Sequence, residues 1–168
     1  MAARKRGVIV RTLVVGDEPG VRSVLLAAFP TSAEADLVDQ LRSGGHAELE
    51  VVAEKEGQTI GHILFSSLKT PFRALGLAPV SVTPTHQRRG IGSALIERGH
   101  ELARAEGWQA SFVLGEPEYY GRFGYSADAA RPFACIYSGP NFMMLALNEP
   151  LPIARSEVGY PPPFEELD

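Results

Sequence analysis

Two glycines and two arginines lie together where an apolar stretch of this chain gives way to a long amphipathic one. The segment reads VSVTPTHQRRGIGSALIERGHELA and runs from residue 80 to residue 103. The start of a helix exposes backbone N–H groups without partners and carries the positive end of the helix dipole. Glycine lets a ligand approach that backbone closely, and arginine adds positive charge and paired donors. The pattern therefore predicts a binding site for a phosphate or pyrophosphate group.

The predicted loop extends from the glutamine to the first turn of the helix. Its residues are Gln87, Arg88, Arg89, Gly90, Ile91, Gly92 and Ser93. A P-loop requires Gly-Lys-Ser/Thr, which this segment lacks. A dinucleotide fingerprint requires a third glycine where Leu95 stands, and Pro84 with further residues separates these glycines from the strand. The plain alternative is an ordinary helix start with solvated arginines. The full Gln-Arg-Arg-Gly-x-Gly pattern after VSVTP favours the ligand site.

The elements that must position this loop follow from hydrophobic periodicity. β-branched or alternating stretches predict strands at 8–15, 48–57, 58–68, 72–82, 108–116 and 142–148. Helices are predicted at 18–29, at 32–45 and at 90–106, with a short helix or turn at 116–124. Asp17 and Ser32 are expected to cap the first two helices, and Glu56-Gly57 to form a hairpin turn. The order predicts an α/β fold: a mixed sheet, antiparallel at first, with one parallel crossover through the 90–106 helix.

Composition limits the class of protein. The 168 residues are 45% hydrophobic, which predicts one domain over 1–168, with a core at 8–148 and a Pro-rich surface tail at 149–168. The net charge of −4 disfavours nucleic-acid binding. No stretch approaches the roughly 20 apolar residues of a membrane span. The single cysteine, Cys135, excludes an internal disulfide and fits a buried apolar role in a cytoplasmic protein.

Three segments together resemble a known family. The loop matches Gln/Arg-x-x-Gly-x-Gly/Ala, the acyl-CoA-binding motif of the GNAT N-acetyltransferases. ELEVVAEKEGQTIGHILFSS at 48–67 and VLGEPEYYGRFGY at 113–125 extend the likeness over most of 8–148 and resemble the YhbS-like branch of that family. The resemblance implies a GNAT-like acyl-CoA N-acyltransferase fold. In that fold a central mixed sheet, flanked by helices, has splayed strands at the cofactor site.

The resemblance also implies where acetyl-CoA binds. The backbone of Val80, Ser81 and Val82 is expected to pair with the pantetheine arm, as another strand would. The loop amides are expected to hold the pyrophosphate, and Arg88 and Arg89 to reach phosphates. The N–H of Val82 is the expected donor to the oxyanion of the transition state.

The family's usual acid is a tyrosine four residues before the glycine of a Gly-Phe pair. Here Tyr120 lies four residues before Gly124, and Tyr125 replaces the phenylalanine. Tyr120 is therefore expected to contact the cofactor and to protonate its leaving thiolate. The neighbouring Tyr119 is expected to pack or to face the substrate.

Two departures from the family pattern leave the general base open. Val113 stands where many members carry an asparagine, and the strand LGLAPVSV has no carboxylate. Glu116 is the first candidate for the base. His62, His86 and a water chain are the alternatives.

The implied activity is transfer of an acetyl group from acetyl-CoA to a primary amine by direct attack in a ternary complex. The amine is a small molecule, an amino-acid-like compound or a protein amine, and acceptor specificity is expected from residues 29–46 and 126–142. The alternative is a non-catalytic acyl-CoA sensor or interaction module. A homodimer is possible for this family. The spacing of histidine and acidic residues matches no metal site.

Overall fold

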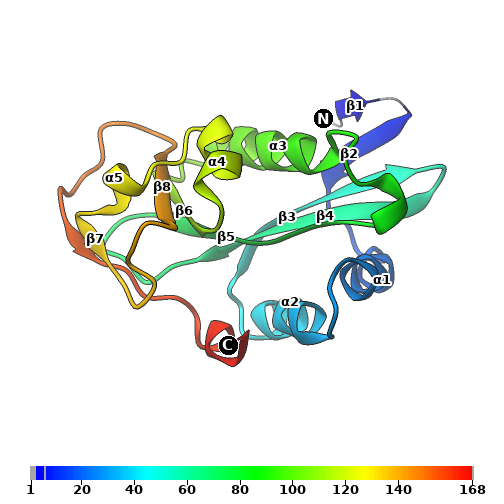
Figure 1. The fold of residues 1–168 in the computed structure, drawn as a ribbon, viewed down its shortest axis with the longest axis horizontal. Coiled ribbons are helices and arrows are strands. Elements are labelled where there is room, and N and C mark those ends of the chain that lie inside the picture. The colour runs from blue at the N-terminus through cyan, green and yellow to red at the C-terminus, as the bar shows by residue number, and fades with distance from the viewer. Residues whose placement is uncertain (1–2, 6, 168) are drawn as a thin grey trace.

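A seven-stranded mixed sheet forms the centre of the computed structural model, which describes residues 3–5 and 7–167 (Figure 1). The strand order is β1-β2-β3-β4-β5-β6-β8. The strands are β1 (Ala3–Lys5), β2 (Val8–Thr12), β3 (Ala47–Lys55), β4 (Gln58–Ser67), β5 (Ala74–Val82), β6 (Ala110–Leu114) and β8 (Phe142–Ala146). All neighbours are antiparallel except β5 and β6. This arrangement confirms the predicted α/β fold with one parallel crossover.

Helices cover both faces of the sheet. Helix α3 (Ile91–Ala105) lies on one face, and α1 (Glu18–Ala28) and α2 (Ala33–Ser43) lie on the other (Figure 1). The shorter elements are α4 (Pro117–Tyr120), α5 (Ala127–Ala130), and 3-10 turns at Pro84–His86, Gly121–Phe123 and Pro162–Leu167. Strands β7 (Phe133–Ala134) and β9 (Ser156–Glu157) form a small parallel pair. No helix in the described part of the chain is long and apolar enough to cross a membrane.

Helix α3 is fixed to the sheet by tight packing. Leu95 and Ile96 are fully buried against the strands. A Cβ atom at Gly99 would overlap the Phe65 ring, so glycine lets the helix approach β4 closely. Near its end, His100 Nε2 lies 2.8 Å from the hydroxyl of Tyr125. This packing holds the start of α3 in place at the end of β5.

Strands β5 and β6 separate along their length. They pair only at residues 74–76 of β5 and 110–112 of β6, whereas β5 stays paired with β4 as far as Val82. The β4–β5 register shifts between Ile63 and Phe65, which marks a bulge. The separation leaves one edge of β5 open at its C-terminal end, which matches the splayed strands that the resemblance implies.

Several local predictions differ from the structure. The first long strand ends at Thr12, because Val14 N–H turns to the Asp17 carboxylate at 2.8 Å. That carboxylate also accepts from Arg11 at 2.8 and 3.0 Å, so Asp17 starts α1 without capping it through its side chain. The C-terminal segment is not only a surface tail, since Phe164 is buried against the α1–α2 layer. The predicted turn holds: Glu56 and Gly57 both have positive φ, as in a type I′ hairpin.

Candidate active site

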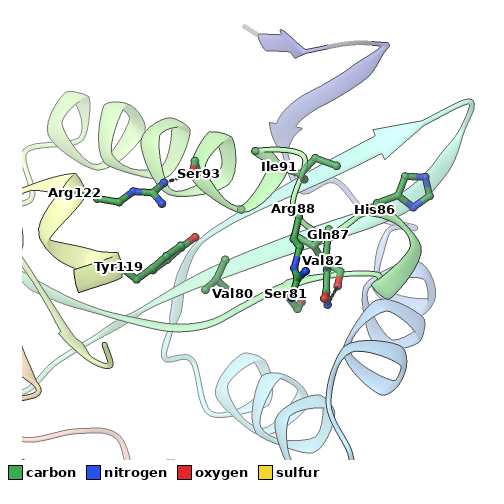
Figure 2. Close-up of a pocket in the computed structure, with 12 residues that line it drawn as sticks. Val80, Ser81, Val82, His86, Gln87, Arg88, Ile91, Ser93, Tyr119 and Arg122 are labelled. Atoms are coloured by element: carbon green, nitrogen blue, oxygen red, sulfur yellow. Dashed lines mark hydrogen bonds between the residues drawn. The ribbon is translucent and has the colours of Figure 1, made fainter. Parts of the chain in front are cut away.

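A cavity of about 510 Å³ opens where the end of β5, the following loop, the start of α3 and the α4 segment meet (Figure 2). The structure brings the predicted strand and loop residues together there, except Arg89. The lining residues are Val80, Ser81, Val82, His86, Gln87, Arg88, Gly90, Ile91, Gly92, Ser93, Tyr119 and Arg122. Arg89 is exposed and lies outside this lining.

The start of α3 presents free backbone donors to the cavity. Gly90 is the N-cap in a left-handed conformation with φ of 79°, and it offers no side-chain cap. Ala94 N–H bonds back to Gly90 at 3.1 Å, so the N–H groups of the three preceding residues have no partner within the helix. Arg88 is also left-handed, with φ of 61°, which costs about 1–2 kcal/mol outside glycine. Strained backbone of this kind is frequent where a loop must fit a ligand.

The open edge of β5 presents a second set of backbone groups. Thr83 N–H donates to Ile60 on β4 at 2.9 Å. Strand alternation therefore turns the backbone of Ser81 toward β4 and the backbone of Val80 and Val82 toward the open side. Gln87 donates to the carbonyl of Val82 at 3.0 Å, which leaves the N–H of Val82 available. An extended ligand could pair with this edge as a further strand.

The charge around the cavity is positive. Arg88 and Arg122 supply two guanidinium groups, and none of the lining residues is acidic. Arg122 donates to the hydroxyl of Ser93 at 3.0 Å and lies 5.1 Å from the centre of the Tyr119 ring (Figure 2). A polyanion such as a diphosphate is therefore favoured here. The sequence prediction missed Arg122, although it is the basic residue in the motif YYGRFGY.

The two adjacent tyrosines occupy different environments. Tyr119 lines the cavity, and its hydroxyl lies 3.2 Å from where a Cβ atom at Gly92 would stand. Tyr120 is absent from the lining. Its ring packs over Gly115 and edge-on against Tyr125, and burial raises the pKa of its hydroxyl to about 12. Tyr119, which the sequence predicts to pack or to face the substrate, therefore lines the cavity, whereas Tyr120, the predicted acid, does not.

The candidate bases are dispersed. Glu116 precedes α4, is exposed, and does not line the cavity. His86 does line it, with Nδ1 3.0 Å from the hydroxyl of Thr83. His62 is buried and bonded to Glu50. Position 113, where many family members carry asparagine, is a buried core valine.

The chain is similar in sequence to known proteins over most of its length. Residues 47–127 match the family described as "Acetyltransferase (GNAT) domain". The uncharacterized N-acetyltransferase YhbS of Escherichia coli K12 is 33% identical over 135 residues, or 78% of this chain and 81% of YhbS. The uncharacterized N-acetyltransferase YjhQ of the same strain is 39% identical over 121 residues, or 67% of this chain and 66% of YjhQ.

Solved structures show the same fold. The crystal structure of YhbS from Escherichia coli in complex with CoA superimposes with a TM-score of 0.90 at 27% identity, covering 100% of this chain and 97% of that one. A GNAT acetyltransferase from Brucella melitensis in complex with acetyl-CoA gives a TM-score of 0.79 at 32% identity, with coverage of 95% and 99%. Sequence identity, coverage and architecture together show that this chain is a member of the GNAT family of N-acetyltransferases.

Proposed function

We propose that this protein binds acetyl-CoA in the cavity at the splayed strands and transfers the acetyl group to a primary amine by direct attack in a ternary complex. One observation carries the proposal. The open edge of β5, the unpaired amides of α3 and two arginines converge on the same cavity, which no acidic side chain lines. Two similar proteins were solved with CoA and with acetyl-CoA, which supports the choice of ligand.

The residues divide the binding between them. The amides of Ile91, Gly92 and Ser93 would hold the pyrophosphate at the positive end of the α3 dipole. Arg88 and Arg122 would pair with its charge. The backbone of β5 would hold the pantetheine arm through the groups that face away from β4.

Acetyl-CoA supplies an activated thioester when it is bound. The N–H of Val82 points to the open side of β5, where it could donate to the oxygen that becomes negative during attack. A tyrosine hydroxyl of the α4 segment would protonate the departing thiolate. Tyr119 is better placed than Tyr120 for this role, because its hydroxyl reaches the cavity.

The acceptor is a primary amine. A cytoplasmic location fits the use of acetyl-CoA and the single cysteine, and a homodimer fits the family. A second candidate function is a non-catalytic acyl-CoA sensor. The lack of any carboxylate among the residues that line the cavity favours that alternative.

Two measurements test the proposal. Calorimetric titration with acetyl-CoA should show saturable binding. Incubation with acetyl-CoA and primary amines (amino acids, polyamines, aminoglycosides and peptides) should release free thiol in proportion to the acetylated amine. Saturable binding with no thiol release from any amine would favour the sensor. Failure to bind millimolar acetyl-CoA would contradict both functions.

A further inference from the structure

A second polar cluster lies on the face of the sheet opposite α3. It comprises Arg42 of α2, Glu50 of β3, His62 of β4 and Ser81 of β5. His62 is completely buried, and the side chain of Glu50 is only 10% exposed. Charged and polar groups are costly to bury, and proteins keep them mainly where each is paired or has a function.

The outer part of this cluster is fully paired. Arg42 Nε donates to both oxygens of Glu50 at 3.2 and 3.1 Å, and its Nη2 donates to one of them at 2.7 Å. The same oxygen of Glu50 lies 2.8 Å from His62 Nε2. Two charged groups act on the imidazole: Glu50 from β3 and Arg42 from α2.

The imidazole has a defined tautomer as a result. Burial lowers the pKa of His62 below its usual value, and Arg42 lowers it further, although the hydrogen bond to Glu50 opposes both effects. The ring is therefore neutral near pH 7. Its proton is on Nε2, where Glu50 accepts it, and Nδ1 keeps a lone pair that can take up a proton.

The inner part of the cluster is unpaired. His62 Nδ1 and the Ser81 hydroxyl are both buried, and neither has a hydrogen-bond partner among the described residues. His62 and Ser81 are directly opposite in the antiparallel β4–β5 pair. Their side chains share one face of the sheet, with Cβ atoms about 4.5–5.5 Å apart. A water molecule or a substrate nitrogen could bridge two polar atoms placed in this way.

Ser81 connects this cluster to the cavity. Ser81 is one of the cavity-lining residues, although its hydroxyl is itself buried, so the hydroxyl lies beneath the wall that the rest of the residue forms. Strand alternation places the side chains of Val80 and Val82 on the α3 face and the hydroxyl of Ser81 on the other. With the cofactor on the α3 side, the opposite side of the splay is left for an acceptor amine, and the buried Ser81 hydroxyl lies beneath that side.

We infer that Ser81 and His62 form the proton-accepting path of the acetyl transfer, while Glu50 and Arg42 hold the imidazole in position. This inference rests on the proposed function and names the group that replaces the missing strand carboxylate. The amine proton reaches Ser81 from the cavity side, and His62 acts through Ser81.

The amine arrives as an ammonium ion, and one of its protons passes to Ser81 Oγ while the serine proton passes to His62 Nδ1. The neutral nitrogen attacks the thioester carbon, so the C–N bond forms and the C–S bond breaks. The tyrosine of the α4 segment protonates the departing sulfur, which becomes the coenzyme A thiol, and the tyrosine regains a proton from the newly bonded nitrogen. His62 then returns its proton to solvent.

The test compares His62→Gln and Ser81→Ala with a matched control. Glutamine at 62 can still donate to Glu50 but accepts no proton at neutral pH. Ser66→Ala is the control, because Ser66 of β4, like Ser81 of β5, is a buried serine whose hydroxyl has no described partner, yet Ser66 lies outside the cavity. Each variant is assayed for acetyl-CoA affinity by calorimetry and for kcat against pH by thiol release with the best amine of the screen.

Both test variants should lose about 100-fold in kcat at pH 7, as expected for a lost general base, while acetyl-CoA affinity stays within about twofold. The loss should shrink as pH approaches the pKa of the amine, because a neutral amine needs no base, and Ser66→Ala should match the wild type. If His62→Gln fails to fold, Ser81→Ala still tests the inference, because that substitution removes only a hydroxyl group. A Ser81→Ala enzyme with wild-type kcat and pH profile would overturn the inference and leave the proposed function intact. A wild-type protein that binds no acetyl-CoA, or acetylates no amine, would overturn both.

Discussion

Replacing Gly92 by valine should abolish cofactor binding without weakening the fold. An ideal Cβ at this position lies 3.2 Å from the Tyr119 hydroxyl and 4.0 Å from the Val82 side chain. Tyr119 can rotate away because its hydroxyl is the far end of a side chain. The added methyl groups would then fill the space in front of the first-turn amides, which the pyrophosphate needs.

The size of the effect follows from the groups affected. Hydrogen bonds to a charged partner contribute about 1.5–3 kcal/mol each, so losing two weakens binding by about 3–6 kcal/mol, or roughly 10²- to 10⁴-fold. Valine also has a better helix propensity than glycine by a few tenths of a kcal/mol, so α3 should not be destabilised. Gly92→Val should therefore lose acetyl-CoA affinity without losing unfolding free energy.

Calorimetry with acetyl-CoA and urea unfolding measure the two quantities. Gly121→Val is the matched control, because a Cβ at Gly121 meets nothing within 4 Å and this glycine does not line the cavity. The control should bind as the wild type does. If Gly92→Val kept its affinity within about twofold, the amides at the start of α3 would not be the pyrophosphate site.

Three further predictions address the same site and its support. Arg122→Gln should weaken acetyl-CoA binding about 10- to 100-fold and make the affinity less dependent on salt, as measured by calorimetry at two ionic strengths. If the variant bound as tightly as the wild type at both ionic strengths, Arg122 would not belong to the binding site. Tyr119→Phe should lower kcat for thiol release more than Tyr120→Phe at similar cofactor affinity, and the reverse order would restore the sequence prediction. Gly99→Ala should cost about 1–3 kcal/mol of unfolding free energy in urea, because the new Cβ overlaps the Phe65 ring, whereas a variant of wild-type stability would refute the packing argument.

The loop at the start of α3 could be predicted from sequence because its determinants are local. Pro84 ends a strand, Gly90 adopts a left-handed conformation, and the residues that follow form a long amphipathic helix. Each of these properties belongs to a residue type at a fixed offset. Resemblance to the family then identified the ligand that such a start would bind.

The choice between two adjacent tyrosines could not be made in the same way. Helix α4 has only four residues, so its orientation depends on how it packs on the sheet. Tyr120 is drawn inward because Gly115 leaves room for its ring, and Tyr119 then faces the cavity. A one-residue difference in a short helix rotates a side chain by about 100°, which a spacing rule measured from Gly124 does not resolve.

The choice of base depends on contacts even farther apart in sequence. The sequence makes Glu116 the first candidate because it sits between the splayed strand and Tyr120, yet the structure leaves it exposed and outside the cavity lining. Glu50 and His62 are joined only because β3 and β4 pair in one register, and Arg42 reaches Glu50 from α2. A one-residue shift of that register would turn His62 to the α3 face and break the cluster.

In the proposed reaction, thioester binding and acceptance of the amine proton take place on opposite faces of the sheet at strand β5. Because side chains alternate, Val80 and Val82 pack toward α3 and the cofactor side, whereas Ser81 turns to the opposite face and the buried imidazole. Because the backbone alternates too, the N–H of Val82 faces the splay, while the backbone of Ser81 faces β4. The same three residues could therefore bind the thioester and accept the amine proton without sharing an atom. An acidic residue is then unnecessary on this strand, and a carboxylate there would oppose the charge of the pyrophosphate.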